Sequence, residues 1–388
     1  MTTNERMQSD ATPTTAPAEL QAWWSEPPDA DVRAALDRLR HTPDVVQIAV
    51  MPDVHLAEDV CIGVVLASTS TLFPAAVGGD IGCGMATIEL GVEADALANP
   101  RTAARVLDGF ARGVPVMRHA RRDAPQMPDA LRDVDVGSPE LDALRRREGA
   151  LQLGTLGRGN HFLELQAADD GGLWVVVHSG SRGLGPAIRA AHEKHAKGSG
   201  LFGIAADTPE GAAYLADVQW ALAYADASRS HMLDVATDVL QRELGAAPRP
   251  DSLMRCHHNF VRKETHDGRD LWVHRKGANA AAPDEPGIIP GSMGTATYHV
   301  VGRGCAGALC SSSHGAGRAM SRSRARRVIG TRRLHDELRG IWYDHRLASQ
   351  LCEEAPGAYK DIGAVMRAQG DLVKIVRCTR PVLVYKGA

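Results

Sequence analysis

The chain has 388 residues with a formal net charge of −3, and 4% of its residues are aromatic. This balance excludes nucleic-acid binding through an overall positive field and disfavours a platform of stacked aromatic side chains, so any such contact has to be local. The seven cysteines lack a regular spacing, the first ten residues are polar and no apolar run is long enough to span a bilayer, which predicts a cytoplasmic protein without membrane contact or a disulfide scaffold.

The chain begins with a segment that carries few apolar side chains. Residues 1–18 are rich in Thr, Pro, Ala and Ser and are predicted to be a disordered tail. A helix is predicted over 29–40, and the apolar run 45–50 predicts a buried strand that leads to Asp53 and His55. Strand ends hold side chains on a rigid base beside a free loop, so both residues are candidates for a site, although an ordinary surface turn explains them equally well.

The next segment is a glycine-rich turn at residues 76–85, which contains Asp80 and Cys83. Apolar strands are predicted on both sides of it, over 62–67 and 86–90. Glycine accepts the positive φ angles of tight turns, so such a turn can direct a carboxylate oxygen and a thiolate sulfur toward one point. That geometry suits a metal ion, whereas the pair taken alone is better explained by a small buried thiol and a turn-forming aspartate.

Two later strands each present a histidine beside a glycine-rich loop. Helical patterns at 102–112 and 140–148 are followed by a glycine-rich turn that ends at His161. The apolar run 174–177 predicts a strand that leads to His178 and then to a second glycine-rich loop. A single histidine in a strand usually has a structural role, so these two indicate a metal site only together with other ligands.

The second half of the chain contributes a hairpin and a turn suited to phosphate. Helical spacing over 210–244 predicts one or two packed helices, and the Asp-Gly pair at 267–268 marks a hairpin. His257 and His258 lie in the first strand of that hairpin, and because alternate residues face opposite sides, only one of them can face a site. The glycine-rich turn at 312–318 is predicted to open a helix, where free backbone N–H groups and the helix dipole suit a phosphate.

Distant segments thus offer one set of metal-type ligands, which comprises Asp80, Cys83, His161, His178 and one of His257 and His258. A thiolate can bridge two cations, so this set predicts a dinuclear centre of the kind that clamps a phosphoryl group. The mixture of hard and soft ligands admits Zn, Fe, Co or Mn. His314 is a candidate nucleophile toward phosphorus, although a further metal ligand or a polar residue at a helix start explains it as well.

Seven motifs resemble, in order, those of the RtcB family of RNA ligases, and the resemblance extends from about residue 47 to residue 387. The motifs are Asp80-Ile-Gly-Cys83-Gly, Gly-Asn160-His161-Phe, His178-Ser-Gly-Ser-Arg182-Gly, Cys-His-His258-Asn259, Arg275-Lys276-Gly-Ala, Pro290-Gly-Ser292-Met-Gly and Ser-His314-Gly-Ala-Gly-Arg318. The resemblance implies an α+β fold, in which a single large domain over residues 19–388 has mixed and antiparallel strands, surrounding helices and a central dinuclear metal site.

The resemblance also implies the chemistry. Members of this family join an RNA 2′,3′-cyclic phosphate or 3′-phosphate end to a 5′-hydroxyl end, with GTP as co-substrate and two Mn²⁺ ions per chain. By this likeness His314 attacks the α-phosphate of GTP and carries GMP, which then passes to the RNA 3′-phosphate and leaves when the 5′-hydroxyl attacks. The same centre first opens the cyclic phosphate. Such a reaction serves tRNA splicing, RNA repair or both.

Matched motif by motif, the resemblance gives each site residue a role. One metal ion would be bound by Asp80, Cys83 and His161. The other would be bound by Cys83, His178 and His258, which leaves His257 pointing away. Asp53 would orient His314 so that Nε2 attacks, and phosphates would be bound by Arg182, Lys276 and Arg318. The guanosine nucleotide pocket would comprise Asn160, His161, Phe162, Leu163, Glu164, His258, Asn259, Pro290, Gly291, Ser292, Met293, Thr297, His314, Gly315, Ala316, Gly317 and Lys386.

The sequence departs from the family pattern at Gly79, where a bulkier residue is common, and at Thr297, where serine is usual. The chain is also short for the family and trimmed between the second and third histidine motifs, which bears on RNA specificity and on the need for an activating protein such as archease. A monomer is expected.

Two other functions are compatible with parts of the pattern. A metal-dependent RNA cyclic phosphodiesterase or phosphatase would keep the metal centre without ligation, but the presence of His314, Asp53 and Lys386 speaks against it. A non-catalytic RNA-binding subunit would tolerate the loss of Asp80 or Cys83, and both are present.

Overall fold

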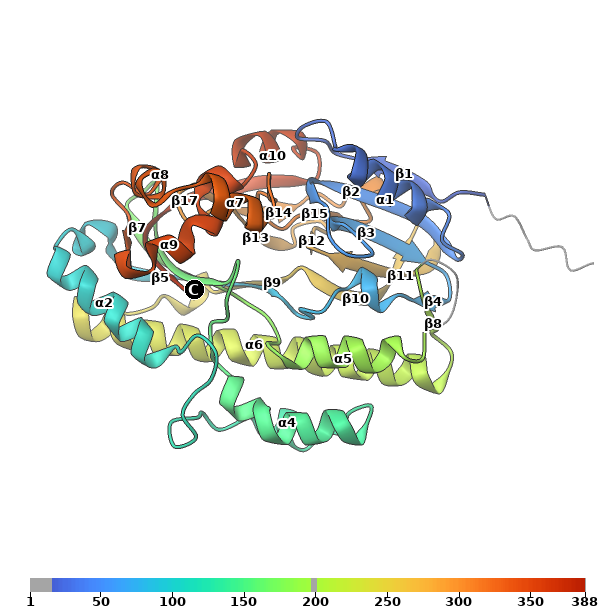
Figure 1. The fold of residues 1–388 in the computed structure, drawn as a ribbon, viewed down its shortest axis with the longest axis horizontal. Helices are drawn as coiled ribbons and strands as arrows, with labels where there is room; N and C mark the ends of the chain where they lie inside the picture. The colour runs from blue at the N-terminus through green and yellow to red at the C-terminus, as the bar shows by residue number, and fades with distance from the viewer. Residues whose placement is uncertain (1–15, 197–200, 388) are drawn as a thin grey trace, which may run out of the picture.

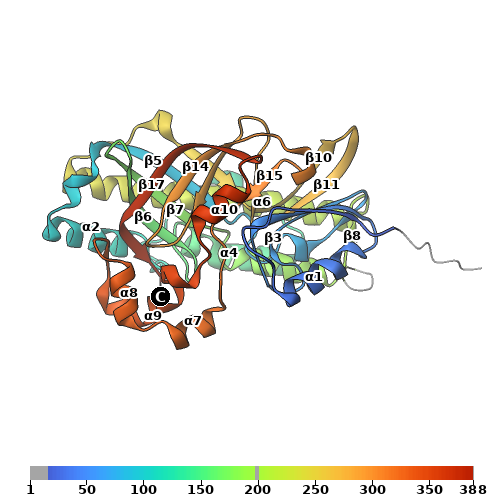
Figure 2. The ribbon, with the colours of Figure 1, turned by 90° about the horizontal axis from the view of Figure 1, so that it is seen from above.

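Two β-sheets organise the protein (Figures 1 and 2). The computed structural model describes residues 16–196 and 201–387. Five strands form the first sheet, in the order β1 (Glu19–Ala22), β2 (Val45–His55), β3 (Ile62–Ser68), β11 (Arg269–Lys276) and β10 (Asn259–His266). The strands pair antiparallel except β1 with β2. The strand predicted over 45–50 is thus confirmed, and it continues to His55.

The second sheet has eight strands and carries most of the site. Its order is β13 (Pro286–Pro290), β14 (Thr297–Gly302), β17 (Val373–Lys386), β6 (Phe162–Ala168), β7 (Gly172–Ser179), β5 (Gly84–Glu93) and β9 (Met254–His257), and β16 (Trp342–Tyr343) pairs with β17. Two further pairs are β12 (Ala278–Ala280) with β15 (Ser311–Ser313), and β4 (Thr71–Leu72) with β8 (Ile204–Ala205). The pair of β12 and β15 connects the two sheets, because β12 contacts β3 and β9, and β15 contacts β2.

Helix α6 (Pro209–Leu244) runs beneath the strands in Figure 1 and packs on β5 and β7. The Thr208 hydroxyl caps its first turn, Pro209 fits its first position, and Gly245 ends it in the left-handed conformation. The segment predicted as one or two helices is therefore one. Its buried face contributes to two of the apolar clusters, one around Phe110 and Val175 and one around Ile81 and Tyr214.

The other helices surround the sheets, which confirms the predicted α+β architecture. They are α1 (Ala30–Arg40), α2 (Pro100–Gly113), α3 (Asp129–Arg132), α4 (Pro139–Gln152), α5 (Leu184–Glu193), α7 (Arg322–Val328), α8 (Thr331–Glu337), α9 (Ala348–Leu351) and α10 (Ile362–Ala368). Within the described ranges, no helix has both the length and the apolar character that crossing a membrane requires.

Two sequence predictions need correction or restriction. The turn at 312–318 does not open a helix, because β15 ends at Ser313 and α7 begins at Arg322 with Ser321 as its cap. Residues 1–15 of the predicted tail lie outside the described residues. Ala18 is buried and donates its backbone N–H to the carbonyl of Arg40, so it packs as part of the fold.

Candidate active site

A cavity of about 300 Å³ lies where the ends of strands from both sheets meet. Its wall includes residues from all seven motifs, which were far apart in the sequence. The predicted site residues that line it are Asp80, Cys83, Asn160, Phe162, Glu164, His178, His258, Asn259, Lys276, Pro290, Gly291, Ser292, Met293, His314, Gly315, Ala316, Gly317, Arg318 and Lys386. The predicted convergence of glycine-rich turns on one point is therefore present.

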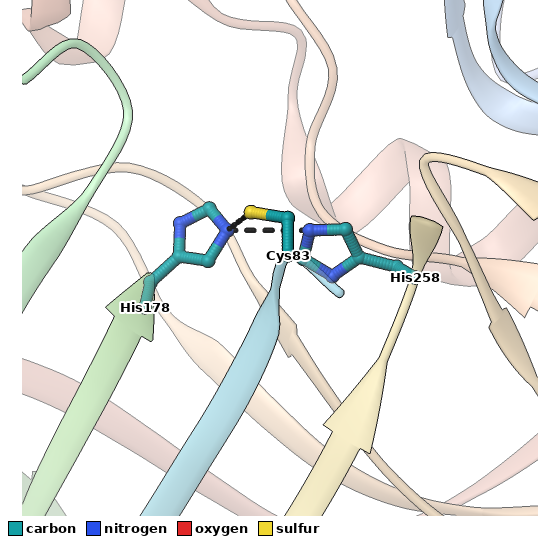
Figure 3. Close-up of side chains that lie close together, drawn as sticks. All are labelled: Cys83, His178 and His258. Carbon is teal, nitrogen blue, oxygen red and sulfur yellow. Dashed lines mark hydrogen bonds between the residues drawn. The ribbon is translucent and has the colours of Figure 1, made fainter. Parts of the chain in front are cut away.

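Cys83 lies at the centre of two groups of possible metal ligands. With His178 and His258 it forms one group, and with Asp80 and His161 it forms the other. Its Sγ is 3.2 Å from Nε2 of His178 and 3.4 Å from Nε2 of His161. Figure 3 shows the first group, in which Nε2 of His178 and Nε2 of His258 are 3.3 Å apart. One sulfur thus touches both groups, as expected for a bridging ligand.

The register of the second sheet produces this convergence. In the pairing of β7 with β5, His178 lies opposite Met85, and Ser179 lies opposite Gly84. On the other side of β5, Gly84 lies opposite His257. The three ligands therefore lie at the same end of three adjacent strands. Cys83 directly precedes β5, His178 is near the end of β7, and His258 directly follows β9. The carboxylate of Asp80 approaches so closely that a Cβ on Gly180 would come within 2.3 Å of its Oδ1, which explains the glycine there.

The imidazoles are arranged for a cation. Nδ1 of His178 is 3.1 Å from the carbonyl oxygen of Asn160, so the proton belongs on Nδ1 and the Nε2 lone pair faces His258. Burial lowers the pKa of His178 and of His258 well below the usual value, so both rings are neutral. Two facing imidazole nitrogens and a thiol offer more lone pairs than protons, and a metal ion fits this set.

The second group of possible ligands, which contains Asp80, supplies a negative charge that would attract a cation. Burial alone would raise the pKa of Asp80, but His161 and Arg182 hold it at about 2, so the carboxylate is ionised. Burial and the neighbouring Asp80 raise the pKa of the Cys83 thiol well above normal. A bound cation would lower the pKa of the Cys83 thiol instead, because a coordinated thiol loses its proton.

His314 lies beside the first metal group. Its ring is 4.8 Å from that of His258 between centroids. Its Nδ1 lies 2.7 Å from Oδ2 of the fully buried Asp53, an ion-pair distance, although the ring is not aligned for a hydrogen bond. The same oxygen accepts the backbone N–H groups of His314 and Gly315, each at 3.2 Å. Asp53 therefore fixes the turn through two backbone hydrogen bonds and lies beside Nδ1 of the ring, so that Nε2 is the nitrogen away from the carboxylate.

Several predicted residues lie beside the cavity and do not line it. Leu163 points into the apolar core, because β6 alternates and directs Phe162 and Glu164 to the cavity. Thr297 is buried, and its hydroxyl accepts a hydrogen bond from Gln166 at 3.0 Å. Neither side chain is placed to touch a ligand.

Both predicted phosphate-binding arginines are engaged with protein groups. The guanidinium of Arg182 lies 3.1 Å from Nδ1 of His161. Arg318 donates to the carboxylate of Glu354 at 3.1 Å and to the carbonyl of Glu353 at 2.6 Å. Lys276 lines the cavity, and burial lowers its pKa to about 8.

His257 turns away from the cavity. Its Nε2 lies 3.0 Å from Oδ2 of Asp226, and its Nδ1 lies 3.2 Å from the carbonyl of Gly82. His258 is therefore the member of the pair that reaches the metal group.

Sequence reasoning missed an acidic residue in the wall, Glu354. Its carboxylate is within 3.3 Å of Lys386 and within 3.2 Å of Arg322 and Arg318. Burial would raise the pKa of Glu354, but Lys386 and the Tyr359 hydroxyl hold it at about 2. Glu354 lies in a short 3₁₀ turn without a glycine-rich motif, so nothing in the local sequence marked it.

Comparison with known proteins agrees with this geometry. The model of the family described as tRNA-splicing ligase RtcB matches residues 35–387. The RNA-splicing ligase RtcB of Escherichia coli (strain K12) is 35% identical over 407 residues, which cover 96% of this chain and 98% of the relative. The RNA-splicing ligase RtcB of Mycobacterium tuberculosis (strain ATCC 25618 / H37Rv) is 31% identical over 428 residues, covering 89% and 98%. A tRNA-splicing ligase RtcB of Thermococcus kodakarensis is 30% identical over 424 residues, covering 87% of each.

Proposed function

The chain belongs to the RtcB family of RNA-splicing ligases, and we propose that it joins an RNA 3′-phosphate or 2′,3′-cyclic phosphate end to a 5′-hydroxyl end with GTP as co-substrate. The protein is thus an RNA ligase. The observation that carries the detailed proposal is the position of His314, whose ring lies against the Cys83 metal group with Asp53 behind it. A phosphodiesterase without ligation would not require a histidine nucleophile with a buried carboxylate beside its Nδ1.

The proposed metal is Mn²⁺, with two ions per chain held by the Cys83 groups. When bound, the ions would neutralise phosphate charge and polarise the bonds to phosphorus. We assign Asp80, Cys83 and His161 to one ion and Cys83, His178 and His258 to the other, in agreement with the two groups of converging donor atoms.

In the first step His314 is the nucleophile. Its Nε2 lone pair forms a bond to the α-phosphorus of GTP, the bond to the β-phosphate oxygen breaks, and pyrophosphate leaves. Asp53 holds the ring through Nδ1 and stabilises the positive charge that the ring acquires. Ala316, Gly317 and Lys386 line the same cavity, where the two backbone N–H groups and the lysine can stabilise charge on the phosphate.

The later steps move GMP and then release it. An oxygen of the RNA 3′-phosphate attacks the phosphorus on His314, the N–P bond breaks, and the RNA carries a diphosphate-linked guanosine. The 5′-hydroxyl of the second RNA end then attacks the RNA-side phosphorus and loses its proton, GMP leaves, and a phosphodiester is formed. A 2′,3′-cyclic end is first opened by water to the 3′-phosphate.

The nucleotide pocket in this proposal is the part of the cavity around Phe162, Glu164 and Lys386, together with the segment from Pro290 to Met293. Lys386 lies 5.6 Å from the ring centre of Phe162 and 3.3 Å from the carboxylate of Glu354, so a cation stands next to the predicted guanosine site. The seven cysteines are free, which fits a reducing cytoplasm. A monomer and an archease-type activator belong to the same proposal.

The test is transfer of label from α-labelled GTP to the protein in the presence of Mn²⁺. We expect an acid-labile and base-stable protein–GMP bond in the wild type, its loss in His314→Ala, and its retention in His41→Ala, which changes an exposed histidine on the far end of α1. Labelling that persists in His314→Ala would show that another residue is the nucleophile, and the absence of label in the wild type would refute the nucleotide step.

A further inference from the structure

A second hollow, of about 760 Å³, adjoins the cavity and opens to the surface. We call it the α7 groove; it lies between the loop from Arg158 to His161, helix α7 and the segment from Ser349 to Glu354. Asp80, Asn160, Arg322 and Glu354 line both spaces, so the groove is continuous with the cavity.

The groove and the nucleophile lie on different sides of the metal groups. The groove is lined by Asp80 and His161, which belong to the same ligand group. His314 instead touches His258, a member of the other group. Cys83 connects the two, so a phosphate entering by the groove would meet the Asp80 group before it reaches the phosphorus held on His314.

The lining of the groove balances three arginines against three carboxylates, whereas the neighbouring segment that contains α7 and α8 is rich in arginine. Residues 318–346 hold nine arginines and three carboxylates, whereas the full sequence has a net charge of −3. Arg322 and Arg326 pair with Glu354 and Glu353 within the groove. Arg158 on the opposite rim is exposed, and the described residues offer it no carboxylate within ion-pair distance.

Beyond the rim, further arginines continue the positive charge. Arg324, Arg327 and Arg332 are exposed on α7 and α8, without an ion pair in the part of the chain that the structure describes. Figure 2 shows α7, α8 and α9 as one group beside the C-terminal end of β17. Exposed guanidinium groups on two successive helices suit a polyanion such as the RNA backbone, whose phosphates an arginine can contact bidentately.

Resting on the function proposed above, we propose that the α7 groove admits the RNA strand that ends in a 3′-phosphate, with its backbone along the arginines of α7 and α8. The terminal phosphate is the strand's most highly charged group, and the Asp80 group is the cation site that it would meet. The neutral 5′-hydroxyl lacks the charge that would draw it there. The nucleotide, by contrast, occupies the cavity on the His314 side.

The experiment measures RNA binding and GMP transfer separately. Gln350→Trp places a bulky ring in the groove at an exposed position, and Gln219→Trp makes the same change at an exposed position of α6, in a hollow that shares no lining residue with the cavity. We expect Gln350→Trp to weaken binding of a fluorescent 3′-phosphorylated oligoribonucleotide at least tenfold while His314 is still labelled by GTP. Gln219→Trp should alter neither quantity.

A surface variant tests the arginines without touching the groove floor. Arg324→Glu combined with Arg327→Glu and Arg332→Glu should weaken the same binding at least tenfold. It should also lower the salt dependence, by about 0.7 in the logarithmic slope for each phosphate of single-stranded RNA that an arginine no longer neutralises. An oligonucleotide with a 3′-hydroxyl should bind the wild type more weakly than the phosphorylated one. Thermal unfolding confirms that each variant is folded.

Three results would overturn the groove assignment. They are unchanged RNA binding in both variants, equal affinity of the two oligonucleotide ends, and loss of GMP labelling in Gln350→Trp, which would make the groove a nucleotide entrance. If the wild type bound RNA through the groove but took no label from GTP, the proposed GMP transfer would be wrong and the groove assignment would stand.

Discussion

At the scale of single residues, Cys83 connects the two groups of side chains that could each hold a metal ion. Its sulfur is the one donor atom shared by both ligand groups, at 3.2 Å from His178 and 3.4 Å from His161. We therefore expect Cys83→Ala to lose both ions, whereas a change in a ligand of one group should spare the other. Metal analysis after dialysis against Mn²⁺ measures this.

Cys352→Ala is the matched control for this experiment. Its thiol is also buried, but it donates to the carbonyl of Ala348 away from the metal groups. Metal content should equal that of the wild type. If Cys83→Ala kept one ion at full occupancy, the sulfur would not be a bridge.

A second prediction concerns Glu164 in the wall of the cavity. Burial raises its pKa to about 7, above the 4.5 of the unfolded chain. The unfolded state therefore releases this proton first, so the carboxyl stabilises the fold below pH 4.5 and this contribution is lost as the pH rises through 7. Between pH 5.5 and 7.5 the loss is about 2 kcal/mol, at 1.4 kcal/mol per pKa unit.

Glu164→Gln removes this titration while it keeps the shape of the side chain. Urea unfolding of the metal-free proteins at several pH values gives the difference in the free energy of unfolding between wild type and variant. We expect the wild type to lose about 2 kcal/mol relative to the variant over that range. Parallel pH profiles would mean that Glu164 is ionised in the fold.

Residue-level reasoning from the sequence worked where a motif narrows the choices. Strand alternation predicted that one of His257 and His258 faces away, and the resemblance to the family selected His258, which the structure places in the cavity. The two histidines do not share one hairpin strand, however, because β9 ends at His257 and β10 begins at Asn259. Glu354 could not be found in this way, since its contacts with Lys386 and Arg322 depend on three segments that meet only in the fold. The engagement of Arg318 by Glu353 and Glu354 was hidden for the same reason.

At the scale of elements, α6 supports the segments around Cys83 and His178 through hydrogen bonds from Arg229. This fully buried side chain donates to the carbonyl of Gly82 at 2.8 Å and to that of Ser179 at 2.7 Å. Gly82 precedes Cys83, and Ser179 follows His178. A Cβ on Gly82 would come within 3.0 Å of Ala225, so the turn lies directly against the helix. One guanidinium thus fixes the spacing of two ligands.

We expect Arg229→Met to weaken metal binding at least tenfold in addition to a loss of about 3 kcal/mol in the free energy of unfolding. Arg145→Met is the matched control, because Arg145 is also buried and also donates to two carbonyls, those of Leu131 and Val134. It should lose similar stability and keep full metal affinity. Equal metal affinities in the two variants would show that Arg229 contributes to stability only and does not position the ligands.

Most elements could be predicted from the sequence because their patterns are local. The strand after residue 45, the helix over 102–112 and the hairpin turn at 267–268 all follow from periodicity or turn chemistry, and the structure has them. The helix expected at 312–318 failed because the backbone N–H groups of His314 and Gly315 bond to Asp53 from a distant strand. Tertiary contacts replaced the local preference at that point.

At the scale of the whole molecule, buried histidines determine how the metal-free fold responds to acid. Loss of solvation lowers the pKa of the fully buried His274 and His299, and of the half-buried His55 in the cavity wall, to about 4. The unfolded chain takes up these protons near pH 6.5, whereas the fold does so only near pH 4, so stability is lost as the pH falls between these values. For three such groups, the free energy of unfolding falls by up to roughly 10 kcal/mol, which is comparable with the whole stability of a protein.

We therefore expect the metal-free protein to unfold in acid with a midpoint between pH 4 and 6.5. His299 offers the cleanest test, because its ring is buried against Trp174 and neither ring nitrogen has a hydrogen-bond partner among the described residues. In His299→Leu the free energy of unfolding should fall less steeply with acid, by about one proton, while the exposed His41→Ala should follow the wild type. A midpoint below pH 4, or a slope that His299→Leu does not change, would mean that these rings are hydrated or protonated inside the fold.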